Sequence, residues 1–132
     1  MTTIYFVRHA HSTYTKEERE RPLSEKGQLD AENVTHLLKD RHIDVVISSP
    51  YKRAIQTVQG IANTYDVSIQ IEEDLRERLL SSESVTDFND AVQKVWEDWD
   101  FAHEGGESND VAQRRAVICM QNILKNIKIR IL

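Results

Sequence analysis

Hydrophobic and polar positions alternate along the chain with two different periods, one typical of strands and the other of helices. Residues 3–7 and 43–47 are short, nearly continuous apolar runs, and residues 67–71 alternate between apolar and polar side chains. These patterns predict three strands, of which the continuous runs are typical of strands covered on both faces. Residues 127–131 alternate in the same way and predict a fourth strand.

Helical segments are predicted between these strands, because apolar residues recur there at spacings of three and four. The apolar positions are Ala31, Val34, Leu37 and Leu38; Ala54, Ile55, Val58, Ile61 and Ala62; Val85, Phe88, Val92, Val95, Trp96 and Trp99; and Ala112, Ala116, Cys119 and Ile123. Three of the four helices have predicted starts, at Ser24, at Ser48-Ser49-Pro50, and at Ser108 or Asn109. Hydroxyl and amide side chains suit helix caps, and proline suits a first turn.

This order of elements predicts an α/β fold with three α/β/α layers and a mostly parallel sheet. A chain of 132 residues with 39% hydrophobic residues is expected to form one domain over residues 1–132. Ligands of such sheets bind beyond the carboxyl ends of the strands. The rule places Arg8-His9 and residues 48–53 on the same rim.

Composition excludes several classes of partner. The formal charge of −5 and the pI near 5.5 argue against nucleic acid and anionic membranes, which require clustered cations. No apolar run reaches the roughly 18 residues of a membrane helix. Cys119 is the only cysteine, so an intrachain disulfide or a thiolate metal cluster cannot form. A cytoplasmic location is expected.

Arg8 and His9 directly follow the first predicted strand. A guanidinium offers a planar fork of donors that matches a phosphate, and an imidazole can act as a nucleophile or a base near neutral pH. The pair therefore indicates phosphate chemistry at the end of a buried strand.

Five segments, in this order, resemble the histidine phosphatase superfamily of phosphoglycerate-mutase-like proteins. They are Phe6-Val7-Arg8-His9-Ala10, the Arg-Pro-Leu-Ser-Glu-Lys-Gly-Gln stretch at 21–28, the segment 46–57 with its Ser-Ser-Pro triplet and its Arg-Ala and Gln-Thr pairs, Glu77, and Gly105-Gly106-Glu107-Ser108. The segments cover nearly the whole chain. The resemblance implies a phosphoglycerate-mutase-like fold and a small-molecule phosphomonoester as substrate.

The resemblance also implies a role for individual residues. His9 is expected to be the nucleophile that forms a phosphohistidine, while Arg8 and Arg53 bind the nonbridging phosphate oxygens. Ser12 is expected to reach the phosphate as well. Glu77 is expected to protonate the departing alkoxide and then to take a proton from the attacking water. No metal ion or other cofactor is implied.

The family carries a second histidine, in a His-Gly pair after a later strand, and this chain stops at Leu132 before such a pair. We therefore expect a domain that is incomplete at its C-terminus, with an activity weakened by about 10²- to 10³-fold for one lost donor. An exposed sheet edge would follow, and a homodimer is one way to cover it.

Two other functions stay open at this point. A phosphoglycerate-mutase-type phosphomutase is disfavoured by His11 and Thr15, which depart from the mutase pattern. A non-catalytic phosphate-binding or interaction module is favoured by the missing histidine. Each residue also has a simpler reading: Arg53 could be a solvated helix residue, and Glu77 could be one of several surface carboxylates in its segment. The segment 78–104 carries no signature that identifies the substrate.

Overall fold

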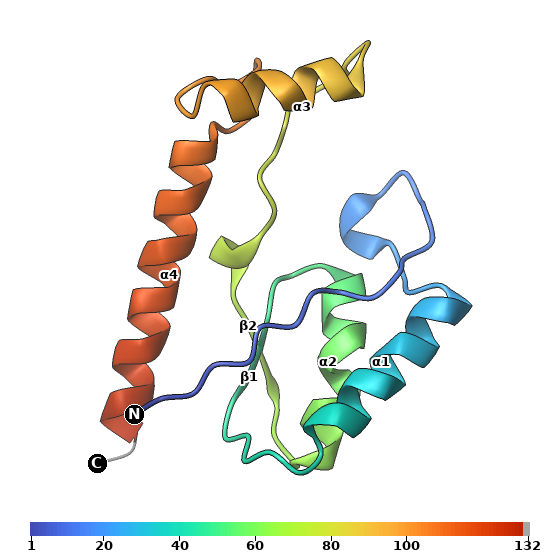
Figure 1. The fold of residues 1–132 in the computed structure, drawn as a ribbon, viewed down its shortest axis with the longest axis vertical. Helices are drawn as coiled ribbons and strands as arrows, with labels where there is room; N and C mark the ends of the chain where they lie inside the picture. The colour runs from blue at the N-terminus through green and yellow to red at the C-terminus, as the bar shows by residue number, and fades with distance from the viewer. Residues whose placement is uncertain (131–132) are drawn as a thin grey trace. The chain divides into compact units, whose positions relative to one another are not determined.

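Helices and strands alternate through the first half of the chain in the computed structural model (Figure 1). The structure describes residues 1–130. Its contacts divide the chain into two units, Met1–Glu73 and Asp74–Leu132, and each is described by itself. Within the described residues, no helix combines the length and the apolar character that crossing a membrane requires.

A parallel pair of strands forms the sheet of the first unit. Strand β1 (Val46–Ser48) pairs with strand β2 (Ile69–Ile71), with Val46 opposite Ile69. Helix α2 (Lys52–Thr64) connects them, as a crossover helix must when two strands run parallel. Mixed helices and strands with parallel pairing confirm the predicted α/β class.

The core of the first unit lies where helix α1 (Glu25–Leu38) and helix α2 meet the sheet. Val46, Ile61 and Ala62 are its buried centre. Partly buried residues pack against this centre: Val34, Leu38, Ile43, Val58, Tyr65, Val67 and Ile69. Leu37, predicted to share the buried face of α1, is instead 73% exposed. It lies about 100° around the helix from Leu38, at the edge of the buried stripe.

The two helices of the first unit begin differently. The Ser24 hydroxyl accepts a hydrogen bond from the amide of Gly27 over 3.1 Å, which confirms the predicted cap of α1. The predicted start of α2 at Ser48-Ser49-Pro50 is wrong. This helix begins at Lys52, its N-cap Tyr51 makes no side-chain cap, and Ser48 donates instead to the carbonyl of Ser49 over 2.8 Å.

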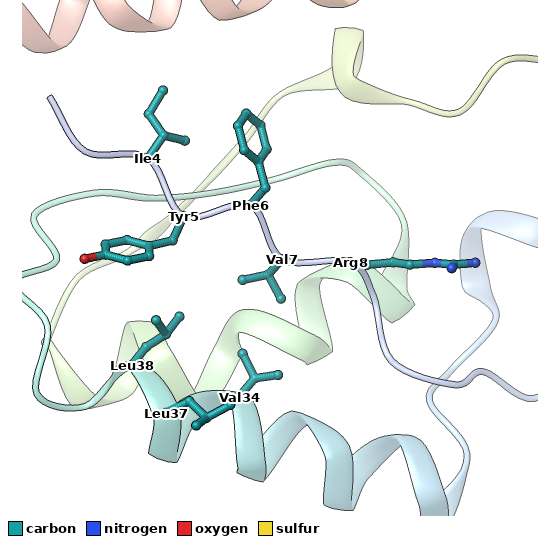
Figure 2. A pocket seen from close by; sticks show the side chains of 8 residues that line it. All are labelled: Ile4, Tyr5, Phe6, Val7, Arg8, Val34, Leu37 and Leu38. Atoms are coloured by element: carbon teal, nitrogen blue, oxygen red, sulfur yellow. The ribbon is translucent and has the colours of Figure 1, made fainter.

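Residues 3–7, predicted as the first strand, form no strand in the structure. The segment is extended, with Tyr5 and Val7 directed toward α1 and with Ile4 and Phe6 directed the opposite way (Figure 2). The side-chain alternation of a strand is thus present without the ladder of backbone hydrogen bonds. A period-2 pattern predicts only the alternation, because the ladder depends on which partner strand is available.

Two helices form most of the second unit. Helix α3 (Phe88–Glu97) is capped by Asp87, and helix α4 (Asn109–Arg130) is capped by Ser108, whose hydroxyl accepts from Val111 over 3.1 Å. Both helices match predicted segments. The buried apolar side chains of the second unit are Ala91, Val95, Cys119 and Ile123. The aromatic side chains predicted on α3 and just beyond it lie outward instead, since Phe88, Trp96 and Trp99 are exposed.

The predicted fourth strand at residues 127–131 is wrong over the part that is described. Helix α4 continues to Arg130, and Ile131 lies outside the described residues. Ile127 lies four residues after Ile123, so it fits the helical period as well as the strand period. A helix gains one local hydrogen bond with each added residue, whereas a strand requires a partner.

Candidate active site

The loop that follows residues 3–7 carries His9, which is half-buried in the first unit. Its ring Nδ1 lies 2.8 Å from the backbone carbonyl oxygen of Ala10. Because a carbonyl oxygen only accepts, Nδ1 carries the proton, and the lone pair of the neutral ring lies on Nε2. Nε2 is therefore the nitrogen that can attack an electrophile.

Thr57 fixes this loop against α2. The amide of Ala10 donates to the Thr57 hydroxyl over 3.0 Å, and that hydroxyl donates to the carbonyl of Arg53, one turn earlier, over 2.7 Å. Thr57 is only 1% exposed, so water does not compete for either bond. The two bonds fix the position of the His9 loop relative to the first turn of α2.

Gln56 holds a second loop to the same helix. Its side-chain oxygen accepts from the amide of Leu23 over 2.8 Å, and Leu23 also forms an isolated antiparallel bridge with Ser12. The sequence assigned no role to Gln56 or Thr57. The signal was their position three and four residues after Arg53, which places polar groups on the otherwise apolar inner face of an amphipathic helix.

Arg53 is buried at the start of α2, with its side chain 4% exposed. Its Nη1 donates to the carbonyl of Glu18 over 2.9 Å, and its Nη2 lies 3.4 Å from a carboxylate oxygen of the same residue. Glu18 begins the 3-10 helix η1 (Glu18–Glu20). Because a buried charge is costly without partners, Arg53 is not the solvated helix residue of the simpler reading.

Two guanidinium groups lie near the ring of Tyr51. Those of Arg53 and Arg19 lie 4.4 Å and 5.9 Å from the centre of its ring, within reach of cation–π attraction. Arg19 also pairs with Glu73, and this hydrogen bond raises the pKa of the guanidinium. Two guanidinium groups, each paired with a carboxylate, thus lie near the N-terminus of α2, whose amides and dipole favour anions.

Arg8 is exposed at the end of a groove of about 460 Å³. The groove lies between the extended N-terminal segment and α1, and it is lined by Ile4, Tyr5, Phe6, Val7, Arg8, Val34, Leu37 and Leu38 (Figure 2). In Figure 2 the Arg8 side chain points away from the apolar side chains. Most of the side chains that line the groove are apolar.

Ser12 and His11 lie in the loop beside the nucleophile. Ser12 is half-buried and takes part in the bridge to Leu23; its contact with a phosphate stays a prediction. His11 Nδ1 lies 2.7 Å from the Ser24 hydroxyl, and a Cβ at Gly27 would lie 2.0 Å from the His11 carbonyl oxygen. Only glycine therefore allows the loop to lie this close to α1.

Glu77 belongs to the second unit, in the segment that follows the 3-10 helix η2 (Glu73–Leu75), and its side chain is exposed. His9 and Arg53 both belong to the first unit, where Thr57 joins the His9 loop to the first turn of α2. The assignment of Glu77 as their proton donor stays a prediction.

The family of the chain follows from comparison with known proteins. Residues 4–130 match the model of the histidine phosphatase superfamily, branch 1. The chain therefore belongs to this superfamily, as its five motifs predict. No curated protein matches the sequence.

Solved structures of phosphatases share the fold. The mycobacterial glucosyl-3-phosphoglycerate phosphatase superposes with a TM-score of 0.74 at 22% identity, over 89% of this chain and 61% of its own. The α-ribazole phosphatase from Shigella flexneri gives a TM-score of 0.73 at 21% identity, over 92% of this chain and 67% of its own. These matches confirm the phosphoglycerate-mutase-like fold. This chain spans about three fifths of the length of the mycobacterial protein.

Proposed function

We propose that this protein is a phosphatase that hydrolyses small phosphomonoesters through a phosphohistidine at His9. The observation that carries the proposal is the chain of hydrogen bonds from the Ala10 amide through the Thr57 hydroxyl to the Arg53 carbonyl. These bonds join the backbone of the loop that carries His9 to the backbone of Arg53 in the first turn of α2. The superfamily and the solved phosphatases of the same fold support this reading.

In the first step, Nε2 of His9 attacks phosphorus, a P–N bond forms and the ester P–O bond breaks. Arg8 and Arg53 bind the nonbridging oxygens, where charge is spread in the transition state. The departing alkoxide takes a proton from the carboxyl group of Glu77. The hydrogen bond from Nδ1 to Ala10 keeps the ring in the tautomer that this attack requires.

In the second step, water attacks the phosphohistidine. The Glu77 carboxylate takes a proton from the water, the P–N bond breaks, and inorganic phosphate leaves with its oxygens still bound by the arginines. His9 and the protonated Glu77 are regenerated. The net charge of −5 fits a small anion held by local cations rather than a polyanion.

The test uses His9→Ala with p-nitrophenyl phosphate. Loss of the nucleophile is expected to lower kcat at least about 10³-fold. A rapid quench with ³²P-labelled ester is expected to trap an acid-labile, alkali-stable label on the wild-type chain and none on the variant. His42→Ala is the matched control, because the His42 side chain is 89% exposed and pairs with Asp44.

The other outcomes distinguish the remaining functions. Unchanged turnover in His9→Ala would contradict the proposal. Binding of inorganic phosphate without turnover of any ester would select the phosphate-binding module. Turnover that depends strictly on a bisphosphorylated primer would select the phosphomutase.

A further inference from the structure

Helix α4 supplies one buried guanidinium to the segment that contains Glu77. Nη1 of Arg115 donates to the carbonyl of Asp74 over 2.7 Å and to the carbonyl of Arg76 over 3.0 Å. Nη2 donates to a carboxylate oxygen of Glu107 over 2.7 Å. The Arg115 side chain is 12% exposed and that of Glu107 is 18% exposed. The residue immediately before Glu77 is therefore fixed by its backbone carbonyl.

The Gly-Gly-Glu-Ser turn holds the other side of Glu77. The amide of Glu107 donates to the carbonyl of Leu79 over 2.7 Å. A Cβ at Gly106 would lie 2.2 Å from the carbonyl oxygen of Leu80, so glycine is what allows the turn to lie against this segment. Glu107 thus binds residue 79 with its backbone and Arg115 with its side chain.

The geometry separates this arrangement from an ordinary surface ion pair. The neighbouring Arg114 pairs with Asp110 one turn away over 2.6 Å, with side chains 69% and 40% exposed. Such an i,i+4 pair does not restrain another segment. Arg115 instead uses its planar fork to bind two backbone carbonyls and a carboxylate at once, which a single ammonium would not reproduce.

We propose that Arg115, held by Glu107, is a positioning residue for Glu77. The Arg115 side chain restrains the backbone before Glu77 and the Glu107 amide restrains it after Glu77, and together they set where the proton of this carboxyl group is delivered. The inference rests on the proposed function, in which Glu77 protonates the leaving alkoxide. It assigns a role to the Gly-Gly-Glu-Ser turn that the proposed chemistry does not itself use.

Leaving groups of different basicity provide the readout. An alkoxide leaves only if it is protonated as the P–O bond breaks, whereas p-nitrophenolate is stable as an anion and needs little help. A merely structural defect lowers kcat/KM for both esters by the same factor. A misplaced Glu77 lowers it much more for the alkyl ester, so the ratio of the two values changes.

The experiment compares kcat/KM for glycerol phosphate and p-nitrophenyl phosphate in Arg115→Ala and in Arg114→Ala. The ratio of alkyl to aryl values is expected to fall about 10-fold or more in Arg115→Ala and to stay unchanged in Arg114→Ala. Arg115→Lys is expected not to restore it. Glu77→Gln is the reference, and adding Arg115→Ala to it is expected to change the ratio no further.

The outcomes keep the two proposals apart. An active wild-type chain whose ratio does not change in Arg115→Ala would overturn the positioning role alone. A wild-type chain that hydrolyses neither ester would overturn the proposed function and the positioning role with it. If Arg115→Ala does not fold by circular dichroism, Glu107→Gln replaces it, with a smaller fall in the ratio expected and an unchanged ratio overturning the inference.

Discussion

Each unit of the chain holds a largely enclosed arginine, Arg53 in the first and Arg115 in the second, and the two are held in different ways. Arg53 meets a carboxylate oxygen of Glu18 at 3.4 Å, and that glutamate side chain is 48% exposed. Arg115 meets Glu107 at 2.7 Å, and that glutamate side chain is 18% exposed. The Glu18 carboxylate lies farther from its arginine and is half exposed to water, whereas the Glu107 carboxylate lies close to its arginine and is largely enclosed.

The two arrangements favour different roles for the two guanidinium groups. An exposed carboxylate at a longer distance contributes little and can be replaced by a competing anion. A short pair that also carries hydrogen bonds to two carbonyls is costly to break. We therefore propose that Arg53 binds a ligand anion and that Arg115 is a fixed structural cation.

The largest expected effect tests whether Arg53 binds the substrate. Arg53→Lys keeps the charge but loses the fork, so kcat/KM for p-nitrophenyl phosphate is expected to fall on the order of 10²-fold. The competitive inhibition constant of inorganic phosphate is expected to rise in parallel. Lys52→Ala, at the exposed neighbouring position, is the control. Equal kinetics for Arg53→Lys and the wild type would mean that Arg53 only stabilises the fold.

The second prediction concerns stability and tests whether Arg115 is a structural residue. Arg115→Ala leaves the Asp74 and Arg76 carbonyls and the Glu107 carboxylate without this donor. We expect the free energy of unfolding to fall by roughly 2 kcal/mol. Arg114→Ala is expected to change it by less than about 0.5 kcal/mol. Urea denaturation followed by circular dichroism measures both, and similar losses in the two variants would contradict the contrast.

The sequence predicted correctly what depends on local patterns and motifs. The inner face of α2 follows from its apolar spacing, and the Ser24 cap follows from a hydroxyl before a helical period. The rule that ligand residues collect beyond parallel strands predicted that the His9 loop and the Arg53 turn are neighbours; the structure joins them through Thr57, although residues 3–7 form no strand. Features of this kind can be predicted without knowing which distant residues they contact.

The errors fall where a partner decides the structure. Residues 3–7 have the alternation of a strand without its ladder, and residues 127–130 satisfy two periods at once and form helix. The role of Thr57 was also missed, because a buried threonine on a helix normally bonds only to its own preceding turn. Thr57 does this and also accepts from the Ala10 amide.

The third prediction tests whether Thr57, which joins the His9 loop to the turn of Arg53, positions the nucleophile. Thr57→Val removes the acceptor for the Ala10 amide, which costs about 1–2 kcal/mol of stability, and kcat is expected to fall about 10-fold as the His9 loop loses its register. Thr64→Val is the matched control, since Thr64 lies on the same helix and its hydroxyl donates to the carbonyl of Gly60, one turn earlier. A stability loss with unchanged kcat would show that the bond does not position His9.

The smallest expected effect tests whether the Arg53 partner is exchangeable. Glu18→Gln keeps the length of the side chain and removes the charge that competes with a phosphate for the guanidinium. The dissociation constant of inorganic phosphate, measured by titration calorimetry, is expected to fall about 3-fold, in line with a half-exposed pair. Glu20→Gln, an exposed neighbour in η1, removes the same charge and is expected to change it far less. Equal effects in the two variants would indicate long-range charge alone, and weaker binding in Glu18→Gln would show that Glu18 holds Arg53 in place, as Glu107 holds Arg115.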